Sequence, residues 1–190
     1  MTTVSETSIC NMALALLGDE RIGALTDNTE AARACNSVYE HLRNGLLRSH
    51  PWRFARARAS LASLSTTPTW GWSYEFTLPT DPYCLRVLDV EEYRQDEWTV
   101  EGRKLLGDFS TANIRYISII TDPMQFDPLF SVALATRISI QICMRLTSDE
   151  NLRNMLRRDF EEHMQEARSA SGQEGEVESI NATIFADERL

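Results

Sequence analysis

The chain has 190 residues, of which 43% are hydrophobic, and its formal net charge at pH 7 is −9. This length predicts one domain of ordinary size, and the apolar content is sufficient for a sizeable core. The negative charge argues against a general affinity for nucleic acids or anionic membranes. No run approaches the roughly 18 apolar residues of a membrane span, and the first residues lack the pattern of a signal peptide, so we expect a protein made and kept in a cytoplasm.

Two helices are predicted before Pro51. In the first, Thr3 and Glu6 have the spacing of a capping box, and Gly18 suits a left-handed stop. The second covers about residues 28–48 and ends before the proline. Apolar residues at three- and four-residue spacing define a face on each: Ile9, Met12, Ala13, Leu16 and Leu17 on the first, and Ala32, Cys35, Val38, Tyr39, Leu42 and Leu46 on the second.

From Trp52 onward the apolar period changes from 3.6 to 2, which predicts strands. In the stretch after the first loop, Trp72, Tyr74, Phe76 and Leu78 alternate with Ser73, Glu75 and Thr77, as in a half-buried strand. A hairpin is expected around Glu101-Gly102. The predicted strands and hairpin are residues 52–61, 72–79, 83–91, 98–107 and 113–120.

Two more helices are predicted, at about residues 128–146 and 148–169. After Ala170 the chain becomes acidic and glycine-containing, which is typical of a flexible segment. Helices and strands that do not alternate favour an α+β fold. We therefore expect a helical body, an inserted antiparallel β lobe and a flexible C-terminal docking tail, over residues 1–51 with 127–170, 52–126, and 171–190, respectively.

The two helical hairpins should pack together as one body. This packing predicts that one apolar residue from each helix is buried: Leu16, Leu42, Ile140 and Phe160. The four cysteines show no metal-binding or disulfide spacing and are expected to be buried free thiols: Cys10, Cys35, Cys84 and Cys143.

The sequence offers little for catalysis. His41, His50 and His163 lie in no nucleophile motif and are interpreted as surface or capping residues. A group of acids is interpreted as a solvated hairpin edge rather than as paired catalytic carboxylates: Asp89, Glu91, Glu92, Asp96 and Glu97. We expect no catalytic, cofactor-binding or metal-binding residues.

The segment "SHPWRFARARASL" combines aromatic rings with arginines. Such a combination suits single-stranded nucleic acid, because bases stack on rings and phosphates pair with guanidinium groups. The basic character does not extend over neighbouring strands, which are acidic. The interpretation that we favour is that Trp52 and Phe54 fix the helix end to the β lobe, while Arg53, Arg56 and Arg58 pair with carboxylates of this chain or of a neighbouring subunit.

Four strings, in the same order, resemble the tail tubular protein A family, the head-to-tail adaptors of tailed bacteriophages. They cover about residues 8–165. The first resembles the family's "NxALxxLG" helix through to its "HPWxFA" ending. The strings are "CNMALALLGDERIGALTDNTEAARACNSVYEHLRNGLLRSHPWRFARARASL", "FTLPTDPYCLRVLDV", "VEGRKLL" and "IRYISIITDPMQFDPLFSVALATRIS".

This resemblance implies a structural virion protein with no enzymatic activity. The expected assembly is a homododecameric ring that binds the portal at the capsid vertex, contacts the tail nozzle or the tail tube or stopper protein, and continues the channel for genome retention and ejection. DNA would pass without specific binding, and the protein would reside at the head-tail junction of the virion after synthesis in the bacterial cytoplasm. Expected subunit or portal contacts are Trp52, Arg53, Phe54, Arg56, Arg58, Ile180, Ile184 and Phe185.

Two alternatives remain open at this point. One is a tail-associated cell-wall hydrolase that uses carboxylates such as Glu91 or Glu97. The other is a DNA-binding protein that uses the arginines of residues 53–58.

Overall fold

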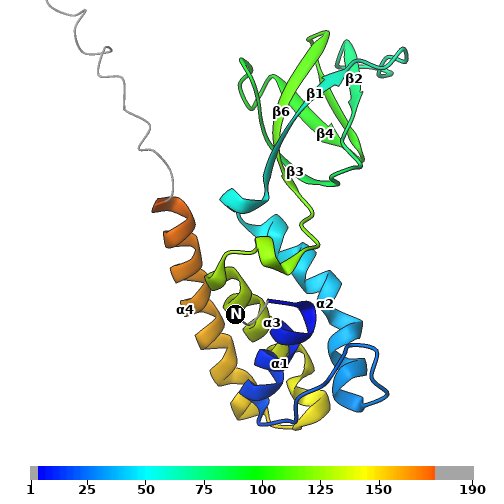
Figure 1. The fold of residues 1–190 in the computed structure, drawn as a ribbon. Coiled ribbons are helices and arrows are strands. Elements are labelled where there is room, and N and C mark those ends of the chain that lie inside the picture. Colours follow the sequence, from blue (N-terminus) through cyan, green and yellow to red (C-terminus); the bar gives the residue numbers. More distant parts are fainter. Residues whose placement is uncertain (1–3, 174–190) are drawn as a thin grey trace, which may run out of the picture.

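A computed structural model describes residues 4–173 and confirms the predicted α+β class. Four helices pack together at one end, and two three-stranded antiparallel sheets lie at the other (Figure 1). In chain order the elements are α1 (Glu6–Leu17), α2 (Glu30–Ser49), η1 (Arg53–Ala55), β1 (Arg56–Ala62), β2 (Tyr74–Thr77), β3 (Cys84–Val90), β4 (Trp98–Glu101), β5 (Lys104–Gly107), β6 (Thr111–Ser118), η2 (Pro123–Gln125), α3 (Pro128–Leu146) and α4 (Glu150–Gln173).

Helix α1 begins later than the sequence suggests. Its N-cap is Ser5 rather than Thr3: the Ser5 hydroxyl accepts a hydrogen bond from the Ser8 amide at 3.1 Å, and the Ser8 hydroxyl accepts one from the Ser5 amide at 2.8 Å. Two serines therefore form the capping box that Glu6 was expected to complete. The predicted stop is confirmed, because Gly18 has a φ of 71° and its amide donates to the carbonyl of Ala15.

The buried face of α1 is rotated relative to the prediction. Ile9, Ala13 and Leu17 are buried as expected, but Met12 and Leu16 remain 39% and 41% exposed. The prediction that Leu16 is buried is therefore wrong. Cys10 and Leu14 take the places of these two residues in the core. Met12 with Leu16 on one side, and Cys10 with Leu14 on the other, both extend the apolar face at helical spacing. Only the position of α3 determines which of the two sides is buried.

Helix α3 is the central helix of the body and contacts the other three. The two helical hairpins thus pack together as predicted, and Ile140 is buried as expected. The prediction of burial is incorrect for Leu42 and Phe160, which are only half-buried at the edge of the core. Among the helices of residues 4–173, α3 is the one with the length and hydropathy to cross a membrane, but 61% of its most apolar window is buried inside the protein. Such burial is usual for a core helix.

All four cysteines are buried and free, as predicted. Two of them, distant in sequence, meet between α1 and α2: a hydrogen bond to the thiol of Cys35, followed by burial, raises the pKa of Cys10.

The strands form two antiparallel sheets with the orders β1-β6-β3 and β2-β5-β4. Their apolar faces share a second core, which includes Phe76 of β2, Leu105 of β5 and Tyr116 of β6. In the β4–β5 hairpin Glu101 pairs with Lys104, so the turn is Gly102-Arg103, one residue beyond the predicted centre.

The alternation predicted for β2 is also incorrect at two positions. Tyr74, expected on the buried face with Phe76, is 37% exposed. Glu75 is only 5% exposed, although it was assigned to the solvent face. Lys104 reaches both of its carboxylate oxygens at 2.8 and 2.9 Å, and the hydroxyl of Thr66 donates to one of them. The hydrogen bond from Lys104, and then that from Thr66, lower the pKa of Glu75. A buried carboxylate is tolerated here because both oxygens have partners.

Helix α4 extends farther than predicted and includes the first three residues of the expected flexible tail. Ser171 is buried, with 5% exposure, and anchors the end of the helix to Arg53. Gly172, which suggested flexibility in the sequence, lies inside this helix. The remainder of the predicted tail, with Ile180, Ile184 and Phe185, lies outside the described residues.

Candidate interaction site at the joint between helices and sheets

Four aromatic rings meet where the helices join the sheets, and we call this group the aromatic joint: Trp52, Phe54, Phe126 and Phe130. The Phe130 ring centre lies 5.2 Å from that of Trp52, 5.1 Å from that of Phe54 and 5.1 Å from that of Phe126. Three of these rings belong to the main core, and Phe54 packs against it together with Leu85 and Leu88 of β3. The aromatic joint therefore fastens the helices to the first sheet.

Two proline-containing strings create this joint. Helix α2 ends at Ser49, with His50 as its C-cap before Pro51, and residues 53–55 form a short 3-10 turn before β1 begins at Arg56. The predicted strand over residues 52–55 is therefore wrong. The turn points the Trp52 ring inward, where it is fully buried and its Nε1 donates to the carbonyl of Leu46 at 2.9 Å.

The second string begins α3. Asp127 is the N-cap and accepts hydrogen bonds from the amides of Leu129 at 2.8 Å and Phe130 at 3.2 Å, while Pro128 occupies the first turn. Proline is favoured there because its missing amide proton would have no helical partner. This cap sets the direction in which Phe130 enters the joint, opposite Trp52.

Two of the three arginines in the segment "SHPWRFARARASL" bind backbone carbonyl groups rather than carboxylates. Arg53 donates from Nε to the carbonyl of Ser171 at 3.0 Å, and Arg56 donates from Nε to the carbonyl of Pro51 at 3.1 Å. Arg58 is exposed on β1. None of the three forms an ion pair with a carboxylate of residues 4–173, so the expected partners are not in this part of the chain. Pairing with a neighbouring subunit stays a prediction.

Arg58 forms no ion pair in the described part of the chain because the nearby carboxylate of Asp89 already has a partner. Asp89 of β3 is bound by Arg115 of β6, whose Nε lies 2.8 Å from a carboxylate oxygen. Arg115 is directly opposite Arg58 in the β1–β6 register. Arg58 and Arg115 therefore lie near the same carboxylate, that of Asp89, and Arg115 of the central strand β6 is the one that binds it.

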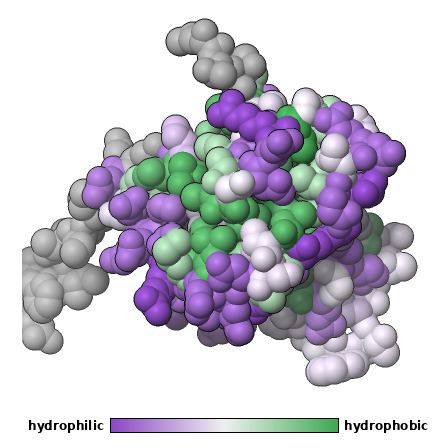
Figure 2. Space-filling view, turned by 90° about the horizontal axis from the view of Figure 1, so that it is seen from below, coloured by the Kyte–Doolittle hydropathy of each residue, from purple (hydrophilic) through white to green (hydrophobic). Residues whose placement is uncertain are grey.

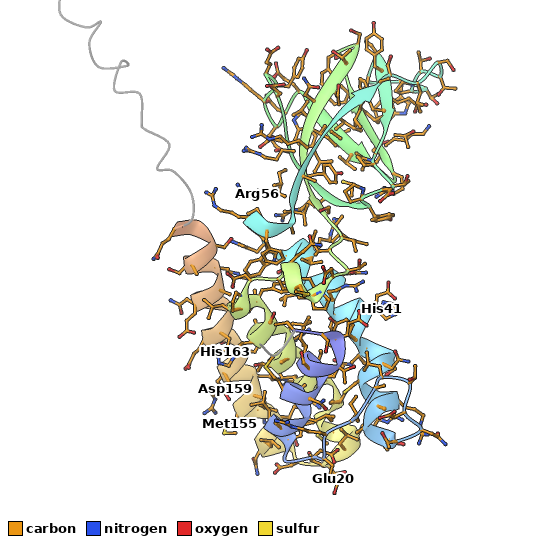
Figure 3. The ribbon with its side chains drawn as sticks, in the orientation of Figure 1. Glu20, His41, Arg56, Met155, Asp159 and His163 are labelled. Atoms are coloured by element: carbon orange, nitrogen blue, oxygen red, sulfur yellow. The ribbon has the colours of Figure 1, made fainter. Side chains whose placement is uncertain are left out.

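The joint is electropositive although the protein is acidic. Burial, followed by the positive charges of Arg53 and Arg115, lowers the pKa of Arg56, and Asp89 opposes the shift. Burial also lowers the pKa of His50, and the charges of Arg168, Arg56 and Arg86 lower it further. Figure 3 shows Arg56 at the level of the joint, on the side of α4. This concentration of positive charge suits an anionic partner surface.

The histidines do not converge on one site. His41 lies on α2 and His163 on α4, and they point to different sides of the helical body (Figure 3). His163 Nδ1 lies 3.0 Å from the hydroxyl of Thr136, and His50 caps the end of α2. Within residues 4–173, no three histidine, cysteine, aspartate or glutamate side chains gather in a way that could hold a metal ion.

The acidic side chains of β3 and the following turn are engaged in contacts on the sheet surface. Asp89 pairs with Arg115, and Glu91 accepts a hydrogen bond from Asn113 at 2.8 Å. These contacts engage both carboxylates on the sheet surface, as expected for a solvated edge.

A cavity that sequence reasoning missed lies beside the joint. It has a volume of about 650 Å³ and is bounded by the end of α2, β3 and the β4–β5 hairpin. Arg48, Arg86 and Arg103 line it. These residues lie far apart along the chain and follow no shared period, so the sequence held no signal for their meeting.

No protein-family model and no curated protein matches this chain.

Proposed function

We propose that the protein is a structural subunit of a virion: a head-to-tail adaptor that forms a ring beneath the portal and joins the capsid vertex to the tail. One observation supports this proposal most strongly. The strings "HPWRFA" and "QFDPLF", both part of the resemblance to the adaptor family, supply the four rings of the aromatic joint. Residues that carry the resemblance thus pack against one another and join the helices to the first sheet.

The surface also supports a role in assembly. Seen from the end of the helical body, apolar side chains gather in the middle of the face and polar ones surround them (Figure 2). Several large apolar side chains of the helices are more than a third exposed, among them Met12, Leu16 and Met155. Apolar areas with a polar rim are typical of protein–protein contacts. Arginines 53, 56 and 58, which have no carboxylate partner within residues 4–173, suit charged contacts to a neighbouring subunit.

The net charge of −9 fits a channel protein that lets DNA pass. Phosphates are repelled by an acidic wall rather than held by it. In this proposal the partners are the portal, the tail nozzle or tail tube or stopper protein, and further copies of the chain, expected to number twelve. The apolar residues Ile180, Ile184 and Phe185 of the C-terminal segment are proposed as an additional anchor to a neighbour or to the portal.

The proposal is tested by co-purification with the portal of the same virus, followed by electron microscopy of the particles. We expect rings on the portal, and we expect the double charge reversal Arg56→Glu with Arg58→Glu to abolish them. The matched control reverses two exposed arginines of α4, Arg157→Glu with Arg158→Glu, and should leave ring formation intact. Failure of the wild-type protein to bind the portal or to form rings contradicts the proposal.

The unpaired arginines also favour one alternative, binding of nucleic acid by residues 53–58. A gel shift at low salt separates the two functions. Tight, salt-sensitive DNA binding that the Arg56→Glu and Arg58→Glu reversals remove, with portal binding unchanged, would support the alternative.

The proposed C-terminal anchor is tested by a deletion that starts after Gln173, because residues 171–173 belong to α4. Full portal attachment by the truncated protein would contradict the anchor.

A further inference from the structure

The cavity beside the joint, which we call the arginine pocket, is a concentration of positive charge with no compensating acid among the residues that the structure describes. Three guanidinium groups line it, from Arg48 of α2, Arg86 of β3 and Arg103 of the β4–β5 turn, and no aspartate or glutamate of residues 4–173 does. None of the three forms an ion pair within that part of the chain. In a chain with 28 acidic and 19 basic residues, such segregation is unexpected for a purely structural cavity.

Two of these arginines are held rigidly by neutral groups. Arg103 donates to the carbonyl oxygens of Cys84 and Pro79, each at 2.6 Å, and its guanidinium lies 3.9 Å from the centre of the Tyr83 ring. Arg48 donates to the carbonyl of Leu85. Carbonyl groups and an aromatic face fix the side chains in place but leave their charges uncompensated, so the pocket is preorganised for an anion.

The pocket also contains donors without acceptors. Nε of Arg86 and Nε1 of Trp98 are both buried and have no hydrogen-bond partner among the described residues, and Trp98 is only 6% exposed. Leaving a buried donor unsatisfied is costly, and the exceptions in folded proteins call for an explanation. An acceptor that enters the pocket and displaces the atoms covering these donors would supply one.

We propose that the arginine pocket binds carboxylates of this chain's own C-terminal segment, residues 174–190. The segment contains five acidic residues and one arginine. Glu174, Glu176 and Glu178 alternate along it, so an extended bound segment presents all three carboxylates on one side, about 7 Å apart. Charge and spacing therefore match a pocket with three separate guanidinium groups.

The position of the pocket supports this occupant. It lies between β3 and β4, which are both edge strands of their sheets, and an extended segment can bind beside such strands. Helix α4 ends at the level of the joint (Figure 1), where Ser171 contacts Arg53 of η1, and the 17 residues that follow could extend over about 60 Å. A polynucleotide is a poorer match because the rest of the chain is acidic and repels phosphates.

The inference does not depend on the proposed adaptor function. Occupation of the pocket is a property of the isolated chain, whereas the adaptor function is tested by attachment to the portal. A protein that binds the portal but does not hold its segment in the pocket would contradict only the inference.

The test uses a fluorescently labelled peptide with the sequence of residues 174–190. The receptor is the full-length protein with Glu174, Glu176 and Glu178 all replaced by Gln, so that its own segment does not compete. We expect saturable, salt-sensitive binding by fluorescence anisotropy. Introducing Arg86→Gln should weaken it at least about tenfold, because a charge-assisted contact and its Coulomb attraction are lost. Arg86 is the arginine to change because no hydrogen bond within residues 4–173 holds its Nε in the fold.

The matched control is Arg58→Gln, the same change on the exposed face of β1, which should leave the affinity unchanged. A second test avoids any change in the receptor: a peptide with the three glutamates replaced by Gln should bind at least about tenfold more weakly. Absence of peptide binding, or equal binding by the Arg86→Gln and Arg58→Gln proteins, would overturn the inference. So would a duplex oligonucleotide that binds through Arg86 more tightly than the peptide.

Discussion

Replacing Phe130 with Ala is the sharpest test of the aromatic joint. The side chain is fully buried, and three other rings lie with their centres 5.1 to 5.2 Å from its own. Buried Phe→Ala changes cost about 3–5 kcal/mol, through the lost transfer free energy and the cavity that remains. Each aromatic pair contributes about 0.5–1.5 kcal/mol beyond its burial, so we expect a loss in the upper part of that range, about 4–5 kcal/mol.

Phe160→Ala is the comparison within the same helical body. Phe160 is half-buried on α4, with the guanidinium of Arg137 5.4 Å from its ring centre. Solvent can fill the space that its removal leaves, so we expect a loss of about 1–2 kcal/mol. The sequence pattern alone predicts a core residue with the full cost of about 3–5 kcal/mol, which the partial exposure of Phe160 reduces.

The assay is urea unfolding followed by tryptophan fluorescence and circular dichroism, with the m-value used to verify that the transition remains comparable. Because a loss of about 4–5 kcal/mol is a large part of the stability of an ordinary domain, Phe130→Leu provides a milder variant, expected to cost about 1–2 kcal/mol. The reasoning is refuted if Phe130→Ala loses less than about 2 kcal/mol, or no more than Phe160→Ala.

Two further predictions concern stability. The pKa of His50 is lower in the folded protein than its usual 6.5, so the unfolded chain takes up the proton first as the pH falls. The stabilisation from neutral His50 is therefore fully present above about pH 6.5. It is lost as the pH falls through 6.5 toward the pKa of the folded state. His50→Gln should flatten this decline in unfolding free energy, and an unchanged pH slope would contradict it. Gly18→Ala should cost about 1–2 kcal/mol in urea unfolding, because a φ of 71° strains any L side chain, although no atom lies within 4 Å of the added Cβ. The control Gly45→Ala, also without a clash but inside α2, should instead stabilise by about 0.5–1 kcal/mol, and equal effects at both glycines would refute the explanation.

The predictions from sequence succeed where the signal is local. The bounds of α3 follow from Asp127-Pro128 at its start and a continuous helical period after it, and the observed helix is Pro128–Leu146. Gly18 ends α1 because only a residue without a side chain adopts its backbone conformation freely. The change of period after α2 likewise locates the strands, although residues 52–55 form a turn, because two rings at positions i and i+2 imitate strand alternation.

The predictions fail where two local solutions are equally good. Leu16 and Leu14 both flank the apolar stripe of α1, and contact with α3 buries only Leu14. Glu75 has the polarity of a surface residue, and it is buried because Lys104 of the adjacent strand neutralises it. Gly172 is a weak helix former, and α4 nevertheless continues through it because Arg53, more than a hundred residues away, binds Ser171.

The sequence by itself determined the α+β class, the order of helices and strands, and the place of Trp52 and Phe54 at the helix end, because hydrophobic periods, caps and prolines act within a few residues of one another. Only the tertiary structure decided which rings meet Trp52 and Phe54, and that Arg48, Arg86 and Arg103 line one pocket. These groupings join residues from separate helices and strands. They depend on how those elements pack, and no local pattern encodes that packing.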